Sequence, residues 1–122
     1  MTNHNFLYII WQNPKTKKSY TVGKLTKEDD GFSFEYCNDY ASAREAGWDL
    51  IQAFPKIQRY ESKKLFSVFA SRLPDKKRKN IKEILNKYVL TSYNGYELLR
   101  RSGGKLPIDT FEFKEPVLIE TR

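Results

Sequence analysis

The 122-residue sequence contains one cysteine and one histidine. A single cysteine excludes an intramolecular disulfide and any metal site built from several cysteines. The histidine, His4, stands near the start of the chain without an orienting partner, which a general base requires, and is interpreted as a solvated terminal residue. Cys37 has no second cysteine and no histidine nearby, and is interpreted as an incidental thiol.

Long apolar runs are also lacking. The longest, Phe6 to Trp11, is far short of the ~20 residues that a membrane-spanning helix needs. The N-terminus has no basic stretch followed by an apolar segment, as a signal peptide would. We therefore expect a cytoplasmic protein that makes no membrane contact. The length suits one domain over residues 1–122.

Two short motifs resemble chemical sites but do not fit them. In Gly103-Gly-Lys105, Leu106 stands where a phosphate loop needs Ser or Thr, and Leu99 stands where it needs its first glycine. The acids Glu28, Asp29 and Asp30 do not have the spacing of a calcium loop and are typical of a turn tip. We therefore predict no enzymatic activity, no bound metal and no cofactor.

Aromatic residues are abundant, with eight Phe, eight Tyr and two Trp. Alternating apolar and polar residues predict three successive strands and then one or two closing strands. These lie at 6–11, 19–25, 32–36, 110–113 and 117–119. Turn residues at 13–18 and 28–31 join the first three strands into a meander. Because strands and helices are segregated along the chain, we expect an α+β fold: an antiparallel β-meander, three to four short helices and a closing C-terminal strand.

Capping residues predict the helices. Helix starts are expected at Ser42, Ser62, Asn80 and Asn94. The stops are Gly47, Pro74 and Gly103. The apolar stretch 48–54 is compatible with a strand or an irregular buried segment, and 56–61 is expected to be a loop. Helical spacing places Phe66 and Phe69 in the core.

The net charge is +7, and its excess lies in one central segment. Residues 56–87 contain eleven Lys or Arg against three acids. The densest part is the run Lys76, Lys77, Arg78 and Lys79, directly before the expected helix start at Asn80. Three interpretations stay open for this run: a solvated turn, a contact with an acidic protein surface, or a contact with nucleic acid.

Aromatic residues often anchor protein interfaces. Trp48 follows a helix stop among polar neighbours, so it is as suited to a surface anchor as to the core. Arg59 and Tyr60 place a cation beside an aromatic ring. The candidate partner-binding residues are Trp48, Arg59, Tyr60, Lys76, Lys77, Arg78 and Lys79.

Several segments resemble a known family. They include Phe66-Ser-Val-Phe-Ala-Ser-Arg-Leu-Pro-Asp75, Tyr96-Glu-Leu-Leu99, Gly103-Gly104 and Phe111-Glu-Phe113, and upstream Val22-Gly23 with the strand at 32–36. Together these segments look like the N-terminal subdomain of HipA-type toxin kinases. In that family a Phe-rich helix ends in a Leu-Pro-acidic turn, and a Leu-Leu helix, a glycine and a last strand follow. The run Lys76 to Lys79 is not part of the pattern.

The resemblance implies a function and a partner. The subdomain also exists as a small separate protein, the HipS-like antitoxin of bacterial toxin–antitoxin systems, which inhibits a separately encoded HipA/HipT-like kinase. It transfers no catalytic residues, because those belong to the kinase core. The alternative is a nucleic-acid-associated module, of the kind found ahead of HIRAN-type DNA-binding domains, that uses the basic segment 56–87. The oligomeric state stays open.

Overall fold

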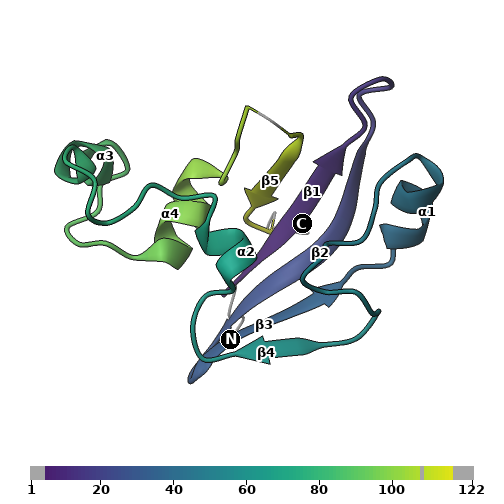
Figure 1. Cartoon of the computed structure of the whole chain (residues 1–122), viewed down its shortest axis with the longest axis horizontal. Coiled ribbons are helices and arrows are strands. Elements are labelled where there is room, and N and C mark those ends of the chain that lie inside the picture. Colours follow the sequence, from purple (N-terminus) through teal and green to yellow (C-terminus); the bar gives the residue numbers. More distant parts are fainter. Residues whose placement is uncertain (1–4, 108, 117–122) are drawn as a thin grey trace, which may run out of the picture.

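The computed structural model describes residues 5–107 and 109–116. Its centre is a five-stranded antiparallel sheet in the order β4-β3-β2-β1-β5 (Figure 1). The strands are β1 (Phe6–Gln12), β2 (Ser19–Glu28), β3 (Gly31–Tyr36), β4 (Tyr60–Ser62) and β5 (Phe111–Lys114). The first three form the expected meander, and the short strands β4 and β5 close its two edges.

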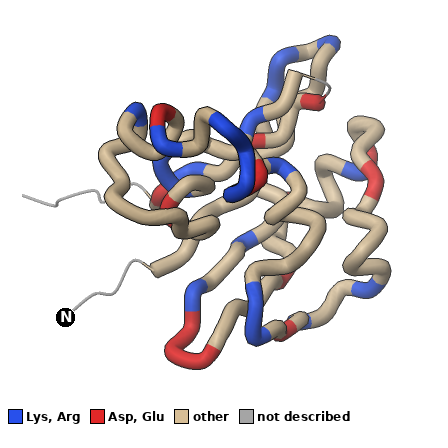
Figure 2. Tube along the Cα trace, turned by 60° about the vertical axis from the view of Figure 1, so that its left-hand side comes forward, with Lys and Arg blue, Asp and Glu red and all other residues tan. Residues whose placement is uncertain are grey.

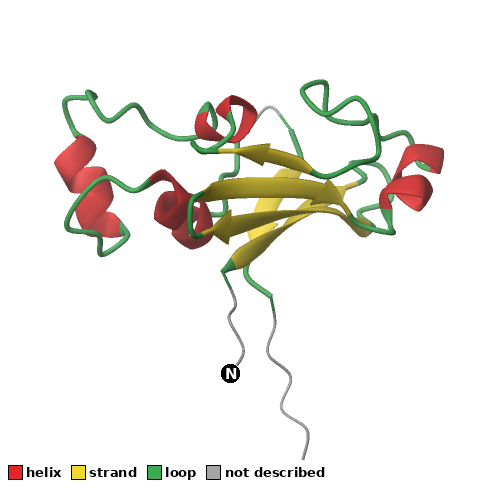
Figure 3. Cartoon of the chain, turned by 90° about the horizontal axis from the view of Figure 1, so that it is seen from below, coloured by secondary structure: helices red, strands yellow, loops and turns green. Residues whose placement is uncertain are grey.

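Four short helices accompany the sheet. They are α1 (Tyr40–Glu45), α2 (Ser67–Ala70), α3 (Ile81–Lys87) and α4 (Gly95–Ser102). The helices lie along one face of the sheet and at its two ends, and within the described residues no helix covers the opposite face (Figure 3). The predicted α+β class with a closing C-terminal strand is confirmed.

Local chemistry explains both turns of the meander. Between β1 and β2, the Asn13 Oδ1 atom accepts a hydrogen bond from the Lys15 backbone at 2.9 Å, which is the usual way that Asn starts a turn. Between β2 and β3, Glu28 pairs with Gly31 across a two-residue turn. Gly31 has φ +148°, and a Cβ there would lie 2.3 Å from the Ser62 carbonyl oxygen. Only glycine fits where β3 meets β4.

The core is aromatic and lies between the sheet and the helices. Leu7, Ile9, Val22, Leu25 and Phe34 form its sheet side and are at most 1% exposed. Facing residues include Phe69, Tyr96 and Leu99. The Phe34 and Phe54 rings stack with centroids 4.3 Å apart. Phe69 lies in the core as predicted, while Phe66 is half-buried against the core cluster.

The structure confirms the predicted start and stop of the last helix. The Asn94 Oδ1 atom accepts a hydrogen bond from the Glu97 backbone at 3.1 Å, capping α4. Gly103, at φ +81°, ends α4 in the left-handed conformation. Asn80 precedes α3 as expected, but its side chain makes no capping hydrogen bond.

Two predicted caps are wrong. Ser42 lies inside α1, which begins after Asp39. Ser62 belongs to β4, paired with Phe32, because tertiary strand pairing outweighs the local capping signal. The predicted loop 56–61 therefore ends two residues early, because β4 begins at Tyr60.

Helix α2 is a single turn that ends at Ala70, before Pro74. The stretch 48–54 is irregular, with Trp48 and Phe54 buried. His4 and the predicted strand at 117–119 lie outside the described residues.

Candidate protein-binding surface

Trp48 is a core residue. It is 4% exposed, and its ring meets Tyr36 and Phe111 edge-on with centroids 6.0 and 6.3 Å away. Gly47, at φ +109°, ends α1, and the Trp48 backbone donates to the Ala43 carbonyl at 2.9 Å. This sharp turn points the ring inward. The expectation that Trp48 is an exposed anchor is wrong. It was based on the polar residues next to Trp48 in the sequence, which do not indicate that rings from distant segments cover its side chain.

Arg59 links the start of β4 to the end of β2 through ion pairs. Its guanidinium binds Glu28 at 2.9 Å and Glu61 at 3.0 Å. The Ser33 hydroxyl donates to the same Glu28 oxygen at 2.9 Å. The pKa of Glu28 is lowered, first by the Ser33 hydrogen bond and then by Arg59. Arg59 is thus paired with two carboxylates of its own chain and brings no free charge to a partner.

Tyr60 closes the loop before β4. Its hydroxyl accepts from the Lys56 backbone nitrogen at 2.9 Å and donates to the Lys56 carbonyl at 3.0 Å. Its ring packs on Phe54 with centroids 4.8 Å apart. The ring and the hydroxyl of Tyr60 therefore both make contacts that stabilise the fold.

The basic turn, Lys76 to Lys79, is fully on the surface. Asp75 shapes the turn: its Oδ1 atom accepts from the Lys77 backbone at 2.8 Å, and its carbonyl accepts from the Arg78 backbone at 3.0 Å. None of the four side chains forms an ion pair within the described residues. Figure 2 shows a long blue stretch on the side of the molecule that carries α3.

The structure does not bring the predicted site residues together. The basic turn lies beside α3, whereas Arg59 and Tyr60 lie at β4, well away from α3 in Figure 1. Trp48 is buried in the core, against the rings of Tyr36 and Phe111. The predicted residues therefore do not form one binding surface.

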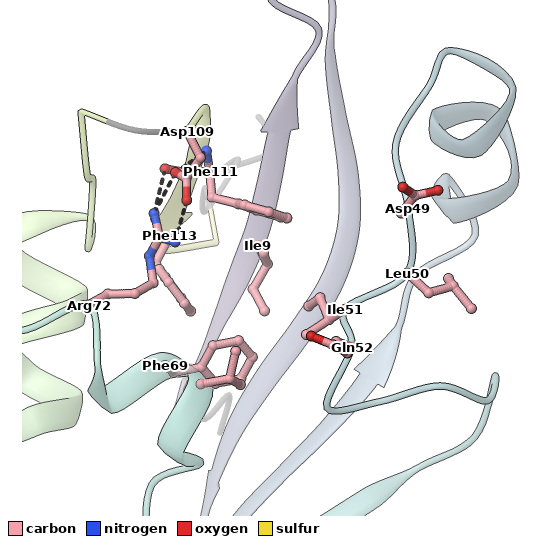
Figure 4. Close-up of a pocket in the computed structure, with 11 residues that line it drawn as sticks. Ile9, Asp49, Leu50, Ile51, Gln52, Phe69, Arg72, Asp109, Phe111 and Phe113 are labelled. Carbon is pink, nitrogen blue, oxygen red and sulfur yellow. Dashed lines mark hydrogen bonds and ion pairs between the residues drawn. The ribbon is translucent and has the colours of Figure 1, made fainter.

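A groove on the helix-bearing face of the sheet is the more coherent site. This sheet-face groove has a volume of about 300 Å³. Ile9 of β1 and Phe69 of α2 form its floor with Phe111 and Phe113 of β5, and the irregular segment at Ile51 forms the opposite wall (Figure 4). A concave apolar surface of this kind suits an apolar side chain of a ligand or partner.

The rim of the sheet-face groove is polar. On one side lie Asp49 and Gln52, both exposed. On the other, Arg72 binds Asp109 through two hydrogen bonds of 2.9 and 2.8 Å (Figure 4). Arg72 also donates to the Gly104 carbonyl at 2.7 Å, and its guanidinium lies 5.6 Å from the centre of the Phe111 ring. An apolar floor with a polar rim is the anatomy of a protein interface.

The groove has little capacity for acid–base chemistry. The hydrogen bonds from Arg72 are the main cause that lowers the pKa of Asp109. A carboxylate with a lowered pKa and both oxygens bonded is a weak base. Cys37 is half-buried elsewhere, and burial raises the pKa of its thiol, opposite to the change that activates a nucleophile. Within residues 5–107 and 109–116, no three His, Cys, Asp or Glu side chains are grouped as a metal site requires.

Sequence reasoning missed the sheet-face groove. Its residues come from β1, the 48–54 segment, α2 and β5, which no local pattern connects. The one available signal was that the apolar stretch 48–54 carries the polar residues Asp49 and Gln52.

Among the helices of the described region, none is long and apolar enough to cross a membrane.

Comparison with protein families gives one match. A family model described as the HipA N-terminal domain matches residues 16–107, well over half of the chain. The matched range runs from the β1–β2 turn to just beyond α4. It includes the basic turn and the 48–54 wall of the sheet-face groove, whereas β1 and β5 lie outside it. No curated protein and no solved structure matches the chain.

Proposed function

Because the chain belongs to the family of HipA N-terminal domains, we propose that it is a non-catalytic module that binds a HipA-family Ser/Thr kinase and holds it inactive, as a HipS-type antitoxin does. The family match is the observation that carries this proposal. The sheet-face groove supports it, since it offers an apolar surface for a protein partner and no acid–base pair.

The sheet-face groove is the docking surface in this proposal. Ile9 and Phe113 are buried at its floor, and the Arg72–Asp109 pair fixes one side of its rim. A partner's apolar side chain that entered the groove would gain about 1.5–3 kcal/mol from burial. The irregular wall at 49–52 would form the polar border of the contact.

Inhibition needs only a difference in affinity between two states of the kinase. A module that binds the inactive state about 10⁴-fold more tightly than the active state, a difference of about 5.5 kcal/mol, shifts the kinase from 1:99 to 99:1 in favour of inactivity. Such a module needs no chemistry of its own. It needs a surface that fits one kinase conformation better than the other.

The test combines the purified protein with a HipA-family kinase from the same organism. Calorimetry measures binding, and autophosphorylation measures inhibition. We expect a complex in which the kinase is inactive. No detectable binding at about 100 µM, or full kinase activity in the saturated complex, would contradict the proposal.

A matched pair of variants locates the contact. Gln52→Arg places a long charged side chain at the rim of the sheet-face groove and should weaken kinase binding about tenfold, or about 1.4 kcal/mol. Gln58→Arg makes the same change at another exposed position, outside the residues that line the groove, and should leave binding unchanged. Equal affinities for the two variants would place the kinase contact elsewhere.

A second candidate function is a nucleic-acid-associated module, which the basic turn favours. Its four cations have no ion pairs within the described residues, whereas Arg59 and Arg72 of the same segment are paired with acids. The test is fluorescence anisotropy with a duplex DNA at several salt concentrations. A nucleic-acid module should lose affinity steeply with salt, with a slope of about −0.9 per phosphate contacted. The triple variant Lys76→Gln/Lys77→Gln/Lys79→Gln should make that slope less steep.

A further inference from the structure

A second groove lies on the side of the molecule that carries α3. This basic groove has a volume of about 530 Å³ and runs between the turn after α2, helix α3 and the segment that follows α4. Its apolar lining consists of Leu73, Pro74, Ile84, Tyr88, Leu98 and Leu106. The proposed kinase contact at the sheet-face groove makes no use of these residues.

The charged residues that line the basic groove are all cations. They are Arg72, Arg78, Lys87 and Lys105, and no Asp or Glu is among the described lining residues. Arg72 is bound to Asp109, and Lys105 lies 3.8 Å from Glu112, the longest ion pair in the described structure. Arg78 and Lys87 form no ion pair there. Glu83 stands one turn before Lys87 on α3, yet the two are not paired.

The walls of the basic groove are fixed by hydrogen bonds. The Tyr93 hydroxyl donates to the Pro74 carbonyl at 2.8 Å, which holds the turn after α2. Arg101 of α4 donates to the Tyr88 carbonyl at 2.9 Å, which holds the end of α3. The groove is therefore formed before any partner arrives, and binding costs less ordering of the protein.

The rim beside Tyr88 carries a strained apolar residue. Val89 has φ +58°, a conformation that β-branched residues rarely adopt. This left-handed conformation ends α3, since the Leu90 backbone donates to the Leu85 carbonyl at 2.8 Å and the Val89 backbone donates to the Asn86 carbonyl at 3.0 Å. Val89 is 80% exposed, so it adds an apolar surface beside the groove.

We propose that the basic groove binds an acidic segment of a partner protein in which Asp or Glu residues flank a large apolar side chain. The apolar side chain enters between α3 and the segment at Leu106, and the flanking carboxylates pair with Arg78 and Lys87. Charge complementarity selects the occupant, since the groove presents unpaired cations and no anion. The apolar lining favours a peptide over nucleic acid, whose phosphates would leave that lining unfilled. The proposal rests on the proposed function in taking the partner to be a protein.

The test is an NMR titration of the ¹⁵N-labelled protein with two synthetic peptides. The probe is acetyl-Glu-Asp-Glu-Leu-Phe-Glu-Asp-amide, and its matched control has Ser-Ser in place of Leu-Phe. We expect the probe to shift amide signals of α3 and residues 102–106, and the control to bind about tenfold more weakly. No shift at about 1 mM probe, or equal binding of the two peptides, would overturn the proposal.

Charge-reversal variants test the cations. The double variant Arg78→Glu/Lys87→Glu should bind the probe about tenfold more weakly, since each change removes one attraction and adds one repulsion. Lys15→Glu/Lys63→Glu reverses two exposed charges outside the basic groove and should bind the probe as the natural sequence does. Thermal melts confirm that both variants are folded. Similar affinities for the two variants would contradict the assignment to Arg78 and Lys87.

Two further measurements distinguish the basic-groove proposal from the nucleic-acid and kinase proposals. A 15-base-pair duplex that displaces the probe and binds more tightly would overturn it in favour of nucleic acid. If the probe binds but the kinase does not, the kinase proposal fails and the basic groove stands. If the kinase binds but the probe does not, the kinase proposal stands and the basic-groove proposal fails.

Discussion

Arg72 and Asp109, thirty-seven positions apart, form a two-pronged ion pair that ties the end of the α2 turn to the start of β5. The Arg72 side chain is 11% exposed and the Asp109 side chain 31%. Asp109 also accepts a hydrogen bond from the Phe111 backbone at 3.2 Å. One pair of side chains thus positions β5 and one rim of the sheet-face groove.

Arg72→Lys should lower the free energy of unfolding by about 1–3 kcal/mol, because lysine cannot reproduce the two parallel hydrogen bonds or the bond to Gly104. Urea denaturation at pH 7 measures the change. Arg44→Lys, on the exposed side of α1, is the matched control and should change stability by less than about 0.5 kcal/mol. Equal stabilities of the two variants would show that the ion pair is dispensable.

The same pair makes stability depend on pH. Because Arg72 lowers the pKa of Asp109 below its ordinary value of 3.8, the folded state favours the carboxylate. The stability that this contributes is fully present above that ordinary pKa and is lost as the pH falls through the lower folded pKa. Asp109→Asn should therefore be less stable than the natural sequence at pH 7, and the difference should shrink as the pH falls below the ordinary pKa of 3.8. A difference that stays constant from pH 7 to pH 2 would contradict this account.

Trp48→Ala should destabilise the whole fold by about 3–5 kcal/mol, since it leaves a cavity beside Tyr36 and Phe111. Circular dichroism melts measure the loss. Trp11→Ala is the comparison: Trp11 is half-buried and stacks on Tyr20 with centroids 5.7 Å apart, so its loss should cost less. If Trp48→Ala kept a melt like that of the natural sequence but lost partner binding, the ring would be an interface residue after all.

Gly23→Ala should cost about 1–3 kcal/mol, because the added Cβ would lie 2.6 Å from the Phe34 ring. Phe34 is fully buried and stacked on Phe54, so it has no room to move. At Gly95, the first residue of α4, the nearest atom is the flexible end of Leu65 at 3.1 Å. Alanine is a good helix former, so Gly95→Ala should be neutral or stabilising by equilibrium denaturation. If Gly23→Ala left the free energy of unfolding unchanged, the backbone of β2 would have to shift to make room for the added methyl group.

Val89→Gly should raise the free energy of unfolding by up to about 1 kcal/mol, since glycine adopts φ +58° without strain. Thermal denaturation measures the gain. Asn86→Gly, inside α3, is the control and should destabilise by about 0.5 kcal/mol through lost helix propensity. A destabilised Val89→Gly would show that the valine side chain is packed in solution.

Features set by neighbouring residues could be predicted from the sequence. The cap at Asn94, the stop at Gly103 and the alternation of β1 to β3 each depend on a few adjacent side chains, and the structure confirms them. Ser62 failed as a cap because it pairs with β3, thirty positions earlier in the chain. That contact outweighs anything its own neighbours encode.

The candidate sites depended still more on distant contacts. Trp48 has polar neighbours in sequence, yet its covering rings come from β3 and β5. The basic turn was evident from composition, but the apolar lining beside it combines residues from α3, α4 and Leu106. Charge can be located in a sequence, whereas a groove exists only after the chain has folded.

The pairing of β1 with β5 has a consequence for synthesis of the protein. Thr110 donates to the Gln12 carbonyl at 2.6 Å across 98 positions, so one edge of β1 gains its neighbour only after β5 has been made. At about 5–20 residues per second, a ribosome needs roughly 5–20 s for that interval. Throughout it the apolar strand has an open edge, the state in which nascent chains most readily aggregate. Production of the protein should therefore be sensitive to translation speed and to chaperones that cover unpaired strands.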